Sequence, residues 1–313
     1  MKRQQNELLN CSHKYKYMNT QHTKLSHSQN FLRDSSLVEK LVQTSSLTSN
    51  DVVLEIGPGK GIITEALAKH CKRIVAVEAD KNLFAELEEK FSSFANLEIY
   101  HQNFLDFSLP KYEYKVFSNI PFNITADIVK KLVDSENSPD DSYLIVQKEA
   151  AEKYGGFRQE TLFSILHKPW FKFSKVYKFQ KSDFSPRPAI DTILLRIEKM
   201  KQPLVEKQNA LAFRDFVAFG FSSMKANLKK GYTNVFGHVQ FLRLATDHGF
   251  NALAKPTDLT FEQWLGIFNY FLSSVEKFRQ VKTRGAYEKL LIQQKSLQKI
   301  HRTRTDRNWR KSK

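Results

Sequence analysis

Four consecutive residues, Asn119-Ile120-Pro121-Phe122, combine an amide, a stiff turn and an aromatic ring. The Asn119 side-chain oxygen can accept a hydrogen bond from an exocyclic amine, and the Phe122 ring can stack on a flat heterocycle. Pro121 fixes the turn and contributes no N–H group. The stretch follows an apolar, strand-like run and precedes a helical pattern at 125–133. These residue types predict a binding site for a heterocyclic amine. An ordinary strand-to-helix turn with a core phenylalanine also fits the tetrapeptide alone.

A glycine-rich turn, Glu55-Ile56-Gly57-Pro58-Gly59-Lys60-Gly61, stands between a short apolar run and another helical pattern. Glycines in such a turn let the backbone approach a ligand closely and let the helix pack against the sheet. The dinucleotide fingerprint is Gly-x-Gly-x-x-Gly, whereas the third glycine here comes one position early. This spacing, with an acid two residues before the first glycine, favours a nucleoside that carries an amino acid over a pyrophosphate.

Two further polar residues follow the next two strand patterns. Glu78 ends one of them and can accept hydrogen bonds from both ribose hydroxyls, and Asn103, just after the other, is placed to bind an adenine edge. Ligands of open α/β sheets bind outside the carboxyl ends of the strands, where all these residues are expected. The order of the glycine turn, the acid and the Asn-Ile-Pro-Phe stretch leads us to infer S-adenosylmethionine as the cofactor.

The elements that must hold these residues alternate between strand and helix patterns, which predicts a parallel sheet covered on both faces. The seven strand candidates are 52–56, 73–78, 97–100, 114–118, 143–146, 171–179 and 192–197. The helical patterns among them lie at 62–70, 82–91 and 125–133. The last two strands are expected to form an antiparallel addition at one edge.

Strand patterns stop near residue 200, and amphipathic patterns at 209–221, 239–246 and 261–273 predict a small C-terminal helical domain. Four parts are therefore expected: a basic flexible arm at 1–25, a catalytic domain at 26–199, a helical RNA-binding domain at 200–278 and a basic tail at 279–313. Residues 282–313 alone hold 11 Lys and Arg against 2 Asp and Glu.

The net charge of +16 over 313 residues indicates an anionic partner. Nucleic acid fits better than a membrane, because no apolar run approaches the roughly 18 residues that a span requires. Cys11 and Cys71 make a poor disulfide framework, and the N-terminus shows no apolar secretory segment, so a cytoplasmic protein is expected. The spacing of the histidines and cysteines does not suggest metal ligands, and no metal is expected.

The chain from His27 to about Ser273 resembles the Erm family of 23S ribosomal RNA adenine-N6 dimethyltransferases, which is related to the KsgA-type enzymes that dimethylate small-subunit rRNA. The matching pieces are Ser28-Gln29-Asn30-Phe31-Leu32, the glycine turn, Glu78, Asn119-Ile120-Pro121-Phe122 and Phe184-Ser185-Pro186-Arg187-Pro188. The resemblance implies an α/β fold, with the Rossmann-like seven-strand sheet of class I methyltransferases and a small C-terminal helical domain.

The resemblance also implies a role for each matching residue. Asn30 and Leu32 would touch the amino-acid end of the cofactor, Gly57 and Gly59 would lie against it, Glu78 would hold the ribose, Asn103 the adenine, and Asn119 would face both the methyl group and the target amine. The family usually has Asp at position 103, so this contact departs from the pattern. The amide oxygen of Asn103 can still accept from the N6 amine of the cofactor.

Adenine N6 is a poor nucleophile, because its lone pair is delocalised into the ring. Two acceptors, the Asn119 oxygen and the carbonyl of either Ile120 or Pro121, would draw the amine toward sp³ geometry and favour the charge that develops on it. The target base must leave its stack, and stacking on Phe122 would return roughly 1–3 kcal/mol. The predicted catalytic residues are therefore Asn119, Ile120, Pro121 and Phe122.

RNA binding is expected to depend on lysines and arginines that contact phosphates. The candidates are Arg187 near the active-site edge, Lys225, Lys229 and Lys230 in the helical domain, and Arg302, Arg304, Arg307 and Arg310 in the tail. The resemblance implies a monomer that acts on 23S rRNA before the ribosome is fully assembled, and resistance to macrolide, lincosamide and streptogramin B antibiotics. The alternatives are a KsgA-type 16S rRNA enzyme, a non-enzymatic RNA-binding relative and a DNA adenine methyltransferase.

Overall fold

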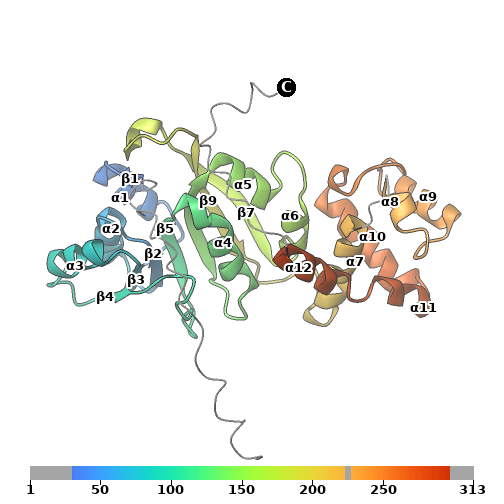
Figure 1. Cartoon of the computed structure of the whole chain (residues 1–313), viewed down its shortest axis with the longest axis horizontal. Coiled ribbons are helices and arrows are strands. Elements are labelled where there is room, and N and C mark those ends of the chain that lie inside the picture. Colours follow the sequence, from blue (N-terminus) through green and yellow to red (C-terminus); the bar gives the residue numbers. More distant parts are fainter. Residues whose placement is uncertain (1–29, 223–226, 297–313) are drawn as a thin grey trace, which may run out of the picture.

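A seven-stranded sheet with the order β4-β3-β2-β5-β6-β9-β7 organises the first two thirds of the chain (Figure 1). The computed structural model describes residues 30–222 and 227–296. The parallel strands are β4 (Leu97–His101), β3 (Arg73–Glu78), β2 (Val52–Ile56), β5 (Lys115–Asn119) and β6 (Asp141–Gln147). At one edge, β9 (Thr192–Lys199) runs antiparallel to both β6 and β7 (Phe171–Lys178). The predicted seven-strand α/β fold, with the late pair at one edge, is confirmed.

Helices cover both faces of the sheet, which explains why its central strands are buried along nearly their whole length. On one face, α1 (Ser35–Gln43) and α2 (Ile62–His70) share an apolar core with β2, β5 and β6. On the other, α4 (Thr125–Asp134) and α5 (Lys148–Gly155) pack on the same strands. The helix α3 (Lys81–Lys90) packs against β3 and β4.

A second, two-stranded sheet joins segments that are far apart in the sequence. The strand β1 (Phe31–Leu32) pairs antiparallel with β8 (Phe184–Ser185), which follows the 3₁₀ turn η3 (Lys181–Asp183). Leu32 and Phe184 are both buried in the core under the sheet. The sequence patterns did not predict this pairing, because two-residue strands carry no periodicity.

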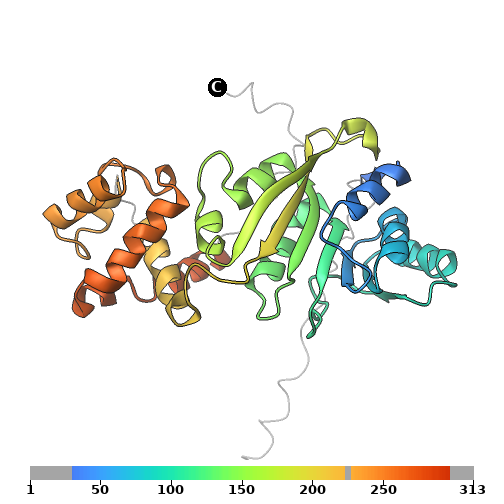
Figure 2. The same cartoon turned by 180° about the vertical axis from the view of Figure 1, so that it is seen from behind.

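Beyond β9 the described chain is helical, as predicted. The elements are η4 (Lys207–Asn209), α7 (Ala210–Ser222), α8 (Leu228–Gly231), α9 (His238–Asp247), η5 (Pro256–Asp258), α10 (Phe261–Ser274), α11 (Lys277–Gln280), η6 (Val281–Thr283) and α12 (Ala286–Ser296). Their core is aromatic, and α6 (Leu162–His167) also contributes to it. Figures 1 and 2 show these helices on the β7 side of the sheet, with α3 and β4 at the other end of the long axis.

The helix α12 folds back onto α7, although it lies in the segment predicted as a basic tail. The Asp215 carboxylate of α7 accepts the backbone N–H groups of Gly285 and Tyr287, each at 3.0 Å. The Arg214 guanidinium lies 5.4 Å from the centre of a Trp170 ring and 5.7 Å from that of Tyr287. The first part of the predicted tail is therefore a packed element. The arm predicted at 1–25 and residues 297–313 lie outside the described residues.

Candidate active site

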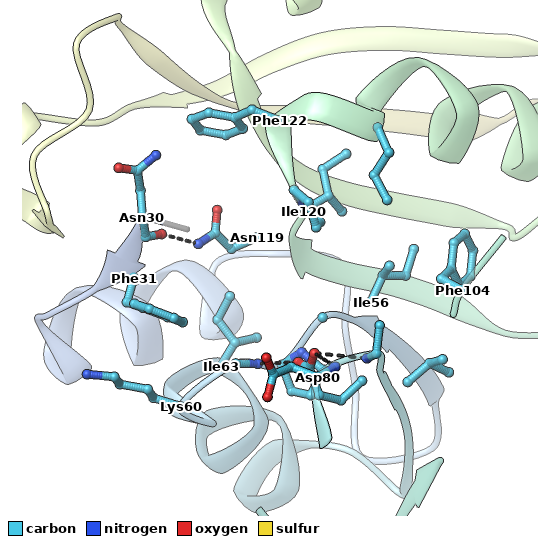
Figure 3. Close-up of a pocket in the computed structure, with 18 of the residues that line it drawn as sticks. Asn30, Phe31, Ile56, Lys60, Ile63, Asp80, Phe104, Asn119, Ile120 and Phe122 are labelled. Atoms are coloured by element: carbon cyan, nitrogen blue, oxygen red, sulfur yellow. Dashed lines mark hydrogen bonds between the residues drawn. The ribbon is translucent and has the colours of Figure 1, made fainter. Parts of the chain in front are cut away.

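The predicted site residues meet in one pocket of about 340 Å³ at the carboxyl ends of β2, β3, β4 and β5. The lining includes Asn30, Leu32, Gly57, Gly59, Glu78, Asn103, Asn119, Ile120, Pro121 and Phe122. Figure 3 shows the side chains converging from the glycine loop below and the Asn-Ile-Pro-Phe turn above. The volume lies in the range of small-molecule sites. The pocket thus brings together the residues that the sequence singled out, whereas their individual binding roles stay predictions.

The glycine loop depends on glycine for both its conformation and its clearance. Gly59 has a φ of +59°, in the left-handed region that favours glycine, and a Cβ there would lie 2.7 Å from the Phe31 ring. A Cβ on Gly57 would come 3.8 Å from Pro121. The loop therefore lies between the β1 segment and the Asn-Ile-Pro-Phe turn, with its backbone open to the pocket.

A buried serine joins the two strands that carry the glycine loop and the Asn-Ile-Pro-Phe turn. The Ser118 hydroxyl, at the end of β5, accepts the Ile56 N–H at the end of β2, at 2.7 Å. Ser118 is fully buried. This bond fixes the offset between the cofactor loop and the turn, and no sequence signal distinguished Ser118 from other residues of the strand.

Glu78 lies under the glycine loop, and three backbone N–H groups already bond to its carboxylate. Its Oε2 accepts from Gly59 at 3.1 Å, while Oε1 accepts from Ala79 and from Asp80, both at 2.9 Å. A carboxylate has about four acceptor positions, so capacity for a ribose hydroxyl remains. Besides its predicted contact, Glu78 therefore braces the loop.

Behind Glu78 lies a second buried acid, Glu55, which is 1% exposed. Its Oε2 bonds to the Thr64 hydroxyl of α2 at 2.7 Å. Burial raises the pKa of the Glu55 carboxyl, the hydrogen bond from the Thr64 hydroxyl lowers it, and the negative charge of Glu78 raises it, which together give a pKa of about 8. Glu55 is therefore mainly neutral at pH 7, and only one of the two acids under the loop needs to carry charge.

The Asn119 amide is held in one orientation. Its Nδ2 donates to the Asn30 backbone carbonyl at 2.7 Å, and Figure 3 shows its Oδ1 turned toward the Phe122 ring. The β1–β8 pairing holds the Asn30 segment in place. Consequently the amide presents an acceptor, not a donor, to a base stacked on Phe122.

The two backbone carbonyls that the sequence left open differ in their bonding. The Pro121 carbonyl accepts the Ile124 N–H and the Thr125 hydroxyl, both at 3.3 Å. Among the described residues no donor reaches the Ile120 carbonyl. Ile120 is therefore the better second acceptor for an incoming amine.

Asn103 is exposed at the mouth of the pocket, in the loop after β4. Its Oδ1 accepts the Leu105 N–H at 3.0 Å. A carbonyl oxygen has two acceptor positions, so one remains for a ligand amine. The predicted contact to adenine is compatible with this geometry.

The predicted RNA-binding residues are spread along the molecule. Arg187 is exposed just beyond β8, near the pocket. Lys229 and Lys230 lie on α8, in the helical region that Figure 1 shows at the far end from α3. Lys225, Arg302, Arg304, Arg307 and Arg310 lie outside the described residues.

Residues 30–222 and 227–296 offer neither a metal centre nor a membrane-spanning helix. No group of three or more His, Cys, Asp or Glu side chains in these ranges could hold a metal ion. No helix there is both long and apolar enough to cross a membrane.

The sequence profile of a family described as ribosomal RNA adenine dimethylase matches residues 19–273. The chain belongs to this family. It is an S-adenosylmethionine-dependent rRNA adenine N6-methyltransferase, and the pocket fits this cofactor because its glycine loop is open, its acid Glu78 is buried and most of its lining is apolar.

Several members of the family resemble this chain along most of its length. An rRNA adenine N-6-methyltransferase of Bacillus licheniformis is 29% identical over 82% of this chain and 91% of its own. An rRNA methyltransferase of Streptomyces thermotolerans is 32% identical over 77% of this chain and 81% of its own. The ribosomal RNA small subunit methyltransferase A of Oceanobacillus iheyensis is 27% identical over 79% and 90%. The crystal structure of the 23S rRNA methyltransferase ErmE superposes with a TM-score of 0.73 at 25% identity, over 78% of this chain and 100% of that one.

Proposed function

We propose that this methyltransferase modifies N6 of a single flipped adenine in the peptidyl-transferase region of 23S rRNA. On this proposal it acts as a monomer in the cytoplasm, before the ribosome is fully assembled, and the modification confers resistance to macrolide, lincosamide and streptogramin B antibiotics. The observation that carries the proposal is the fixed acceptor at Asn119 beside the Phe122 ring.

The chain supplies orientation and charge stabilisation to the target base. Asn119 Oδ1 and the Ile120 carbonyl accept the two hydrogens of N6, which directs the lone pair into the pocket and stabilises the positive charge that develops on the nitrogen. Phe122 stacks on the everted ring and offsets part of the cost of unstacking it. No tuned base is required, because the proton can leave N6 after the transfer.

Other residues hold the methyl donor. S-adenosylmethionine supplies an electrophilic methyl group when bound. On this proposal Asn30, Leu32, Gly57 and Gly59 contact its amino-acid end, Glu78 its ribose and Asn103 its adenine. The buried lining of the pocket excludes water from the reacting atoms.

The choice of 23S rRNA is supported by the similarity of the fold to that of the 23S rRNA methyltransferase ErmE. The second candidate is a KsgA-type enzyme for 16S rRNA. It is favoured by one observation, the 27% identity to a small-subunit methyltransferase over 79% of this chain.

The test is expression in a macrolide-susceptible bacterium, followed by primer extension on 23S and 16S rRNA and mass spectrometry of the nucleosides. We expect a stop at one adenine of the 23S peptidyl-transferase region, growth on a macrolide, and neither with Asn119→Ala. Modification confined to 16S rRNA would establish the second candidate instead.

A further inference from the structure

Lys131, on α4, forms hydrogen bonds to the loop at residues 103–107, which forms one wall of the pocket. The Lys131 ammonium donates to the backbone carbonyls of Phe104 and Leu105, both at 2.8 Å, and to that of Phe107 at 2.5 Å. A lysine ammonium has three N–H donors, so all three are used. The ammonium also lies 5.0 Å from the centre of the Phe104 ring.

The loop needs such a cation because its backbone is irregular. Three carbonyl dipoles from residues 104–107 converge on one point, where they would repel one another without a positive charge. The Phe104 carbonyl also accepts the Phe107 N–H at 3.1 Å, so Lys131 adds to the bonding within the loop. Phe104 and Leu105 both line the pocket, next to Asn103. Movement of these carbonyls would therefore change the pocket wall directly.

The influence of Lys131 extends through the peptide plane to Asn103. In a trans peptide the carbonyl of one residue and the N–H of the next point in opposite directions. With the Phe104 carbonyl bonded to Lys131, the Leu105 N–H is directed to the other side, where it donates to Asn103 Oδ1 at 3.0 Å. This chain of bonds fixes which end of the Asn103 amide is the oxygen.

The orientation matters because an asparagine side chain has one accepting end and one donating end. A purine with a 6-amino group offers a donor there, whereas a 6-oxo purine offers an acceptor. An amide free to rotate by half a turn would suit either base. Held as observed, its oxygen favours the amino purine.

The same helix also carries the catalytic turn. The 3₁₀ turn η2 (Phe122–Ile124) leads directly into α4, and Lys131 lies in the last turns of that helix. One rigid element therefore links the residues that grip the target amine to the loop beside the cofactor's purine.

We propose that Lys131 is a positioning residue that sets the selectivity of the cofactor pocket for a 6-amino purine, by holding the 103–107 loop and through it the Asn103 amide. The proposal rests on the assignment of this pocket to S-adenosylmethionine. Lys131 touches neither the cofactor nor the target base in this role.

The test measures binding of S-adenosylhomocysteine and S-inosylhomocysteine by calorimetry. We expect the wild type to bind the adenosyl compound more tightly than the inosyl compound. Lys131→Met should lower the affinity for the adenosyl compound by about tenfold, the size of one lost hydrogen-bonding interaction, and should change the affinity for the inosyl compound little. The ratio of the two affinities should therefore approach one. The matched control is Lys130→Met, which removes an exposed lysine from the same helix and should change neither affinity.

A second variant, Asn103→Asp, separates an effect on selectivity from a general loss of binding. In the Asn103→Asp variant both oxygens of the side chain are acceptors, so its rotation no longer matters. Adding Lys131→Met to this variant should therefore reduce the preference for the adenosyl compound much less than Lys131→Met alone does. If Lys131→Met does not fold, Lys131→Arg serves, because its planar fork retains the charge but fits three converging carbonyls poorly, and a partial loss of preference is expected.

The possible outcomes are distinct. An unchanged preference in a folded Lys131→Met variant, or an equal loss in both backgrounds, would overturn the inference. A wild type that binds neither compound would instead contradict the assignment of the pocket.

Discussion

The amide nitrogen and the amide oxygen of Asn119 have different roles. Its nitrogen is bonded to the Asn30 carbonyl, and its oxygen is left for the substrate. The bond to Asn30 prevents the amide from rotating and removes the entropy cost of orienting it during the reaction.

We therefore expect Asn119→Ala to lower the methylation rate by about 10²–10³, the range for loss of one oriented transition-state hydrogen bond. Binding of S-adenosylhomocysteine should change little, because the other pocket residues remain. Single-turnover methylation of transcribed 23S rRNA and calorimetry measure the two effects. A near wild-type rate would remove Asn119 from the mechanism.

Asn119→Asp is the informative companion. The carboxylate retains an acceptor toward the target amine but loses the donor to Asn30, and it places a negative charge beside that carbonyl. We expect a rate between those of the wild type and Asn119→Ala. A rate as low as that of Asn119→Ala would mean that orientation by Asn30 is as important as the acceptor itself.

Glu55 makes stability depend on pH. Its carboxyl has an ordinary pKa of 4.5, which burial raises to about 8 in the folded chain. Between these values unfolding releases a proton, so this group lowers the free energy of unfolding by up to about 1.4 kcal/mol per pH unit as the pH rises. The stability that it contributes is complete below the lower value and is lost by pH 8.

Glu55→Gln should remove that dependence, because the amide is neutral throughout. Urea unfolding of both proteins in parallel from pH 5 to pH 8 is the measurement. We expect similar stabilities at pH 5 and a growing advantage for the variant toward pH 8. Two curves that stay parallel across the range would show that the Glu55 carboxyl is ionised in the folded protein.

The sequence could place residues in the pocket where a residue type and a strand end coincide, as at Gly59, Glu78 and Asn119, while their roles stay predictions. It could not reveal Ser118 or Lys131, because their roles depend on contacts with residues that are distant in sequence. A single serine in a strand, or a single lysine on an amphipathic helix, has the same local pattern whether it is bonded or solvated.

At the scale of elements, α12 shows how composition can mislead. Its basic neighbourhood predicted a tail, yet the helix is capped and packed. The cap is the buried Asp215 of α7, which is 5% exposed and bonds to both Gly285 and Tyr287. The residue that stabilises α12 lies about 70 positions upstream, beyond any local pattern.

Asp215→Ala should destabilise the protein by about 1–3 kcal/mol, because it leaves two N–H groups at the start of α12 without their acceptor. Thermal melting measures the loss, and proteolysis near residue 285 reports release of the helix. Asp215→Asn, which retains one acceptor, should lose less. Equal stability of all three proteins would show that α12 is held by its apolar contacts alone.

The long strands were predicted because buried parallel strands are apolar along most of their length, as in β2 and β3. The two-residue strands β1 and β8 and the six-residue helix α6 were missed, since each spans fewer than two periods of its pattern. Tertiary contacts, and not local propensity, hold these three elements in place.

At the scale of the whole molecule, a large share of the net charge of +16 stands at the end of the sequence. Residues 297–313 contain 7 Lys and Arg against 1 Asp. Deleting residues 282–313 would also remove α12, so it is a poor test of this charge. A chain that ends after Ser296 retains the packed helix and removes only the terminal cations.

We expect this shortened chain to bind S-adenosylhomocysteine normally and RNA more weakly. The slope of log affinity against log salt should become shallower by about 0.7–0.9 for each lost phosphate contact. Fluorescence anisotropy with a 23S rRNA fragment, over about 50 to 200 mM salt, measures it. An unchanged slope would show that the terminal cations do not contact RNA phosphates.

The pairing of β1 with β8 has a consequence for when the enzyme becomes active during its own synthesis. Asn30 is among the first described residues, but its partner strand ends at Ser185, so the carbonyl that orients Asn119 is fixed only after that residue has left the ribosome. Contacts of such large sequence separation form late in folding. A nascent chain therefore lacks the oriented Asn119 amide until more than half of the protein has emerged.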